Sequence, residues 1–140
     1  MNTSTGLSAT DLLDHMFAVE MRFLQQDDAD LDLLATAFHR GVMVHEPASL
    51  PYAGDWRGLD GVGRLFKTMR DTWSELAVEG LQAAQSGDTV HMSCRLRLTA
   101  RRSGTTLSQP FAEVLRFEDG LLIEGMPFYF DTAAIRFALD

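Results

Sequence analysis

Residues 113–123, with the sequence EVLRFEDGLLI, predict two antiparallel strands joined by a tight turn. Asp119-Gly120 marks the turn, because glycine accepts the positive φ that a two-residue hairpin requires. Apolar residues continue on both sides of this turn. The strands are therefore expected over Leu107–Glu118 and Leu121–Phe130.

Two more strands precede this hairpin. Apolar and polar residues alternate with a period of two over Val90–Leu98, and this pattern is typical of a strand with one buried face. A weaker strand is expected over Leu76–Ala84. Together these segments predict an antiparallel meander in the second half of the chain.

The first half is mainly helical. Ser8 and Asp11 are typical of a helix start, and the apolar stripe that follows contains one glutamate, Glu20. A second helix is expected over Leu31–Phe38, with Gly41 as its C-terminal stop.

Three further elements complete the prediction. Val42–Glu46 is a short strand that a proline ends, and Asp60–Trp73 is a third helix with one apolar face. Asp131-Thr132 can cap a last helical turn near the C-terminus.

This order predicts an α+β fold in which a curved antiparallel sheet wraps around three helices as a cone-shaped barrel. The 140 residues are 46% hydrophobic and 23% charged, which fits one domain over residues 1–140 and excludes a disordered chain. A strongly twisted sheet around helices leaves an interior, so the cone is expected to hold a pocket.

Charge and targeting patterns narrow the function classes. Twelve Lys and Arg against twenty Asp and Glu give a net charge of −8, which disfavours nucleic acid and anionic membranes as partners. Residues 1–6 are polar and lack the pattern of a secretory signal, and no window is apolar enough to span a membrane. A cytoplasmic location is therefore expected.

Two stretches resemble the SnoaL-like branch of the nuclear transport factor 2-like superfamily. They are VHEP at 44–47 with PYAGDWRGLDGV at 51–62, and EVLRFEDGLLI at 113–123. That group includes ketosteroid isomerases, polyketide cyclases and limonene-epoxide hydrolases. The resemblance implies a cone-shaped pocket for an apolar small molecule in a homodimer, and it does not name the reaction, because this fold hosts many functions.

Glu46 is the first catalytic candidate. Val42, Val44 and Glu46 share one strand face, while Met43 and His45 share the other. If the first face lines the cone, burial raises the pKa of the carboxyl group and makes it a usable proton shuttle. The resemblance implies a general base here, because ketosteroid isomerases carry their base before a proline in the matching strand. The alternative is an acid at the strand end that faces water or caps the turn.

Glu113 is the second catalytic candidate. It lies between Phe111 and Leu115 on one face of its strand. The resemblance implies a carboxylic acid that stays protonated in apolar surroundings and donates a hydrogen bond to a developing oxyanion. The alternatives are a salt bridge to Arg95 or Arg97, and a dimer contact.

The chain lacks catalytic residues that two reactions of the family require. The isomerases use a tyrosine of the first helix, and that position falls at or beside Arg22. The epoxide hydrolases need an aspartate near the end of the last strand, where this chain has Phe128. Neither established set of catalytic residues is complete here.

The remaining pocket residues follow from the apolar faces and from the resemblance. Glu20 and Arg22 could support Glu113 in stabilising an enolate, and Tyr52 belongs to a resembling stretch. The side chains expected to line the cavity are Phe17, Trp56, Met92, Phe111, Met126 and Phe128.

Metal and cofactor chemistry is not expected. The four histidines lack the short spacing of a metal-ligand pair, and no glycine-rich phosphate loop follows a strand. Cys94 lies on an apolar strand face, which favours a core position over a nucleophile.

Three functions remain open. The first is an enzyme of the isomerase or cyclase type, in which Glu46 moves a proton on an apolar cyclic or polyketide-like substrate and Glu113 stabilises the enolate. The second is non-catalytic binding of an apolar metabolite. The third is a homodimeric interaction module that uses the sheet face of Arg95, Arg97 and Arg116.

Overall fold

The computed structural model describes residues 7–140, so the polar segment 1–6, on which the expected lack of a secretory signal rests, lies outside the described part. Its elements are α1 (Ala9–Leu24), α2 (Leu31–Leu34), β1 (Phe38–Glu46), β2 (Gly54–Arg57), α3 (Gly58–Thr72), β3 (Trp73–Ser86), β4 (Thr89–Ala100), β5 (Thr106–Glu118), β6 (Leu121–Tyr129) and α4 (Thr132–Leu139). None of the helices within 7–140 is long and apolar enough to cross a membrane.

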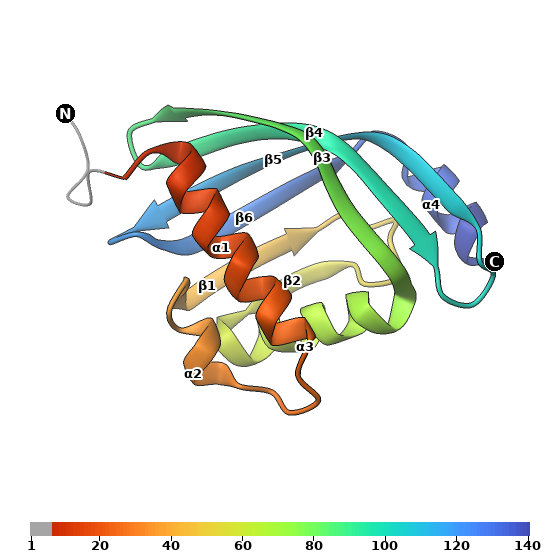
Figure 1. Cartoon of the computed structure of the whole chain (residues 1–140), viewed down its shortest axis with the longest axis horizontal. Coiled ribbons are helices and arrows are strands. Elements are labelled where there is room, and N and C mark those ends of the chain that lie inside the picture. The colour runs from red at the N-terminus through yellow and green to blue at the C-terminus, as the bar shows by residue number, and fades with distance from the viewer. Residues whose placement is uncertain (1–6) are drawn as a thin grey trace.

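The six strands form one sheet in the order β2-β1-β6-β5-β4-β3 (Figure 1). Neighbouring strands pair antiparallel, except β1 and β6, which run parallel. The prediction of an all-antiparallel sheet is therefore wrong for this pair. The chain between β1 and β6 is long enough to return to the same end of the sheet, which a parallel pairing requires.

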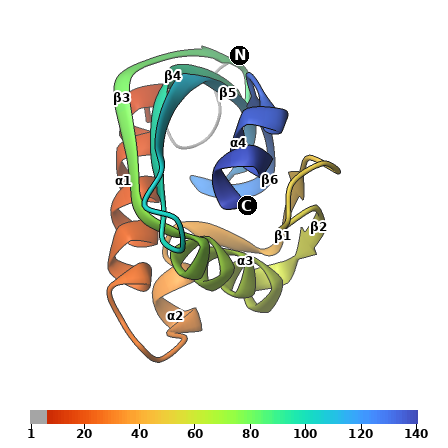
Figure 2. The ribbon, with the colours of Figure 1, turned by 90° about the vertical axis from the view of Figure 1, so that its right-hand side faces the viewer.

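The sheet curves strongly without closing, and α1 and α3 pack against it and against each other. Figure 2 shows the strands arching around the interior, with α4 at one end. The cone-shaped α+β fold is confirmed, with four helices in the described chain rather than the expected three.

The largest difference from the sequence prediction lies between α2 and β1. The helix ends at Leu34, and Phe38 already belongs to β1, where it pairs with Leu122 of β6. Gly41 lies inside this strand and does not stop a helix. Pairing with a strand some 80 residues later in the sequence overrides the local helical pattern.

Several local predictions are confirmed. Ser8 caps α1 by accepting a hydrogen bond from the Asp11 amide at 3.1 Å, and Asp131 caps α4 in the same way. Asp119 and Gly120 take φ values of 54° and 79°, which the tight turn between β5 and β6 requires.

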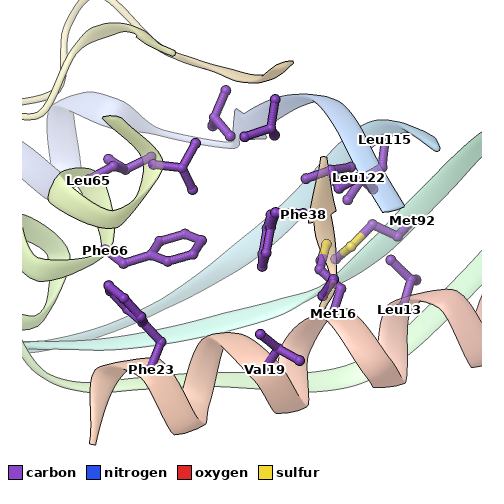
Figure 3. Close-up of a cluster of buried hydrophobic side chains, with 14 of the residues drawn as sticks. Leu13, Met16, Val19, Phe23, Phe38, Leu65, Phe66, Met92, Leu115 and Leu122 are labelled. Carbon is purple, nitrogen blue, oxygen red and sulfur yellow. The ribbon is translucent and has the colours of Figure 1, made fainter. Parts of the chain in front are cut away.

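The core lies between the helices and the concave face of the sheet (Figure 3). The rings of Phe23 and Phe38 pack edge-on against Phe66, with centroid distances of 6.3 and 5.5 Å. Met16 of α1 and Met92 of β4 point toward one another in the same cluster. The alternation predicted for β4 is confirmed, since its apolar side chains are buried and Arg95 is exposed.

Candidate functional site: an acid-lined cavity

A cavity of about 80 Å³ lies within the core, between α1, α3 and the concave face of the sheet. Its walls are aliphatic, aromatic and methionine side chains, among them Phe17, Met92 and Phe111, which the sequence analysis placed there. Among the described residues, the polar groups of the lining are three glutamates and one tyrosine: Glu20, Glu46, Glu113 and Tyr129. A single water needs roughly 10–15 Å³ by such a measure, so the cavity has room for a compact ligand.

Glu46 ends β1 on the same face as Val42 and Val44 and points into the cavity. It is only 8% exposed, and its Oε1 has no hydrogen-bond partner in residues 7–140. Burial, assisted by repulsion from Glu20, raises the pKa of Glu46 to about 8. The alternative of a water-facing acid at the strand end is therefore wrong.

Glu113 enters the same cavity from β5, between Phe111 and Leu115. Burial raises its pKa well above the ordinary value, and repulsion from Glu46 and Glu20 adds to this shift. Gly125 of β6 leaves the necessary room, because a Cβ there would lie 3.0 Å from Oε2 of Glu113. The sequence analysis did not single out Gly125; a glycine inside a strand is the signal that could have done so.

The two arginines considered as partners of Glu113 lie on the opposite, exposed face of β4. Arg97 donates from Nε to Oε1 of Glu75 at 3.3 Å, and Arg95 donates to Oγ of Ser108 at 3.2 Å. The salt-bridge interpretation of Glu113 is thus wrong, and its carboxyl group stays in apolar surroundings.

The third acid comes from α1. Glu20 lies on the buried stripe of the helix, and burial raises its pKa to about 7. Arg22, two residues later, is exposed in the last turn and does not reach the cavity. Its assignment to the pocket is wrong, since a two-residue step on a helix turns the side chain to another face.

Tyr129 of β6 supplies a phenol that the sequence analysis did not assign to the site. Its hydroxyl lies 3.5 Å from the Tyr52 hydroxyl, which accepts a hydrogen bond from Nε1 of Trp73 at 3.1 Å. An indole N–H can only donate, so Trp73 occupies one acceptor site of the Tyr52 oxygen, and either phenol can be the donor between Tyr52 and Tyr129. When Tyr52 is the donor, the proton of Tyr129 can point into the cavity.

Tyr52 and Trp56 stand behind the cavity wall rather than on it. Tyr52 is 1% exposed, and its carbonyl oxygen accepts a hydrogen bond from Nε1 of Trp56 at 3.1 Å. Both had been expected to line the pocket; in the structure they support Tyr129 and the loop that follows β1.

Met126 and Phe128 are the other corrections to the predicted lining. They are exposed on the outer face of β6, whereas Pro127 and Tyr129 face the cavity. Both faces of the strand carry large apolar side chains, and the charged residue that marks the outer face is Glu124, two residues before Met126. Pairing of Glu113 with Pro127 determines which face points inward.

His45 occupies the outer face of β1, opposite Glu46 as predicted. Its Nδ1 lies 2.7 Å from Asp55 of β2 and its Nε2 lies 2.8 Å from Glu124 of β6. Hydrogen bonds that the imidazole donates to Asp55 and to Glu124 raise the pKa of His45. The imidazole thus links β1 to both neighbouring strands, β2 and β6, and helps to position the strand that carries Glu46.

Cys94 is buried in β4, and burial raises the pKa of its thiol to about 11, so it is protonated at neutral pH. Within residues 7–140, no group of three or more His, Cys, Asp or Glu side chains is arranged to hold a metal ion.

The curved, unclosed sheet with its packed helices is the cone-shaped α+β fold of nuclear transport factor 2-like proteins. The model of the SnoaL-like domain matches residues 19–125, and the chain belongs to this family. No curated protein matches the sequence significantly.

Solved structures agree on the fold. The chain is similar to a nuclear transport factor 2-like protein from Burkholderia thailandensis (23% identity, 96% of this chain and 98% of that one, TM-score 0.77). It is also similar to TerC crystallised with polyporic acid (16% identity, 91% of this chain and 97% of that one, TM-score 0.73). A third similar structure is a protein of ketosteroid isomerase-like fold from Catenulispora acidiphila, in complex with trimethylamine (14% identity, 85% of this chain and 85% of that one, TM-score 0.68). At these identities the likeness is one of fold.

Proposed function

We propose that this protein binds a compact, largely apolar small molecule in the cavity and moves a proton on it, as isomerases and cyclases do. The observation that carries the proposal is the convergence of Glu46 and Glu113 on one cavity whose walls are otherwise apolar. Two structural neighbours hold small organic molecules, which supports a ligand-binding role. Non-catalytic binding in the same cavity is the alternative.

In the proposed reaction, the Glu46 carboxylate removes a proton from the carbon next to a ligand carbonyl. The electrons of that C–H bond form an enolate, and Glu46 returns the proton to the γ-carbon of an unsaturated ketone. The neutral acid of Glu113 and the phenol of Tyr129 donate hydrogen bonds to the enolate oxygen. A pKa of about 8 suits Glu46 as a base near neutral pH.

The test is the conversion of 3-cyclohexen-1-one into its conjugated isomer, followed by ultraviolet absorbance. Wild-type protein is expected to accelerate it, and Glu46→Gln is expected to lower the rate by about 100-fold or more. Glu79→Gln, on the exposed part of β3, is the matched control and should retain the wild-type rate. A wild type that binds the ketone without converting it would overturn the proton transfer and leave non-catalytic binding.

Glu113 is expected to act as a neutral donor rather than as an ion. Glu113→Gln keeps the shape and a donor, so the free energy of unfolding at neutral pH should stay almost unchanged or rise slightly. Glu113→Ala should weaken ketone binding more than it weakens folding. Denaturant unfolding and calorimetric binding measure both; a loss of more than about 1 kcal/mol in the Gln variant would show that a charged contact had been broken.

We also propose that two copies associate through the outer face of β4–β6. Phe128 is 51% exposed there beside Met126, and Arg95 on the same face can pair with acids of a second copy. Light scattering should give about twice 15.6 kDa for the wild type and the single-chain mass for Phe128→Glu. A wild-type mass of 15.6 kDa at all concentrations contradicts the dimer.

A further inference from the structure

The cavity combines three acids with no base. Glu20, Glu46 and Glu113 come from α1, β1 and β5, and none of the described lining residues is Lys, Arg or His. Repulsion between these carboxyl groups contributes to the pKa shifts of Glu46 and Glu113, so they interact across the cavity. A carboxylate that ionises in this cavity is stabilised neither by bulk water nor by a positively charged side chain among the lining residues.

Glu46 provides a second and separate observation. Its side chain is more than nine-tenths buried and its Oε1 lacks a hydrogen-bond partner in the described chain. Buried polar atoms are nearly always satisfied, and an exception calls for an explanation. A ligand group that is positively charged, or that donates a hydrogen bond, would give Oε1 of Glu46 the partner that it lacks.

The walls suit a positive charge that carries alkyl groups. Five aromatic residues line the cavity: Phe17, Phe38, Phe66, Phe111 and Tyr129. Aromatic faces carry negative partial charge and attract ammonium groups, most strongly where water is excluded. The thioethers of Met16, Met69 and Met92 add polarizable contacts for methyl groups.

A metal ion is a poorer match for the same acids. No set of three His, Cys, Asp or Glu side chains in residues 7–140 is arranged to share one ion. A compact organic cation does not need such an arrangement, because it can contact one carboxylate directly and aromatic faces on its other sides. A volume of about 80 Å³ favours a small head group of this kind.

We propose that the ligand of this cavity carries an alkylated ammonium group, which sits between the Glu46 carboxylate and the aromatic walls. This inference rests on the proposed function in that the cavity is the ligand site, and it names the ligand class. A Glu46 carboxylate that is paired with the ammonium is not a free base, so this complex corresponds to the non-catalytic binding given as the alternative. At neutral pH the bound cation takes the place of the Glu46 proton, which passes to the buffer. The ammonium is held as an ion, and no covalent bond forms or breaks.

The sign of the pH dependence follows from this exchange. Glu46 must lose its proton to pair with the cation, and its pKa is about 8. Glu20, with a pKa of about 7, and Glu113 face the same cavity and change its charge in the same direction. Affinity for a cation should therefore rise with pH from 6 to 8.5, whereas affinity for a neutral ligand should stay level or fall.

The experiment compares choline with 3,3-dimethyl-1-butanol, which has the same shape with carbon in place of the charged nitrogen. Isothermal titration calorimetry on the full chain at constant ionic strength is expected to show at least tenfold tighter binding of choline at pH 8.5. The choline affinity should fall at least fivefold at pH 6. Buffers of different ionisation enthalpy should reveal proton release on binding.

Glu46→Gln provides the matched variant. It should abolish the preference for choline while leaving binding of the alcohol unchanged, which also shows that the cavity is still folded. Equal or tighter binding of the alcohol by the wild type would overturn the ammonium inference and leave the proposed function standing. If neither molecule binds, the ammonium inference fails. If 3-cyclohexen-1-one also fails to bind, the proposed function fails with it.

Discussion

Replacing Glu46 by Gln is expected to stabilise the protein near pH 9 by roughly 3–5 kcal/mol, since each unit of pKa shift corresponds to about 1.4 kcal/mol. The folded-state pKa of Glu46 is raised from 4.5 to about 8, so the folded chain keeps a proton that the unfolded chain releases. The stability of the wild type must then fall as pH rises between about 4.5 and 8, and level off above that range. The amide of Gln carries no charge at any of these pH values.

Denaturant unfolding at pH 5 and pH 9 measures this effect. The two proteins should differ little at pH 5, where folded Glu46 is protonated, and most at pH 9. Glu79→Gln removes the same formal charge from an exposed site on β3 and should not reproduce the pH-dependent gain. A Glu46→Gln variant that is less stable than the wild type at pH 9 would show that the carboxylate has a partner in the folded state.

Phe38→Ala is expected to lower the free energy of unfolding by about 3–5 kcal/mol, as truncation of a buried phenylalanine does. Phe38 is 1% exposed, packs edge-on against Phe66 and forms part of the cavity wall. Its loss removes a ring contact and enlarges a space that the core cannot easily fill. Thermal and denaturant unfolding should show the same ranking.

Phe137 offers the control for this truncation. It is 81% exposed on α4, so Phe137→Ala should change the free energy of unfolding by about 0.5 kcal/mol or less. If Phe38→Ala cost no more than Phe137→Ala, β1 would not begin inside the core, and the pairing of Phe38 with Leu122 would be wrong.

Much of the fold follows from local patterns. The period of two around Val90–Leu98, the turn at Asp119-Gly120 and the cap at Ser8 each depend on neighbouring residues only, and the structure has all three. The strand at Phe38–Gly41 does not follow from local patterns, because it forms by pairing with β6, which is distant in the sequence. Only tertiary contacts could have shown that parallel pair.

The site divides in the same way. Glu46 and Glu113 stood out because a carboxylate interrupts an apolar strand face, and both lie in the cavity. Tyr129 and Gly125 were missed because β6 has large apolar side chains on both faces, and their direction depends on pairing with β5. Arg22 was placed by its correspondence to the tyrosine position of the isomerases, and that correspondence carries no information about the direction in which a helical side chain points.

The most direct test of the account is a carbon-13 NMR titration of the glutamate carboxyl groups, with Glu46→Gln and Glu113→Gln used for assignment. We expect Glu46 to titrate near pH 8, Glu20 near pH 7, and Glu113 well above the ordinary range for glutamate. Titration of all three below pH 5 would contradict it, because the cavity would then hold hydrated carboxylates rather than protonated acids in apolar surroundings.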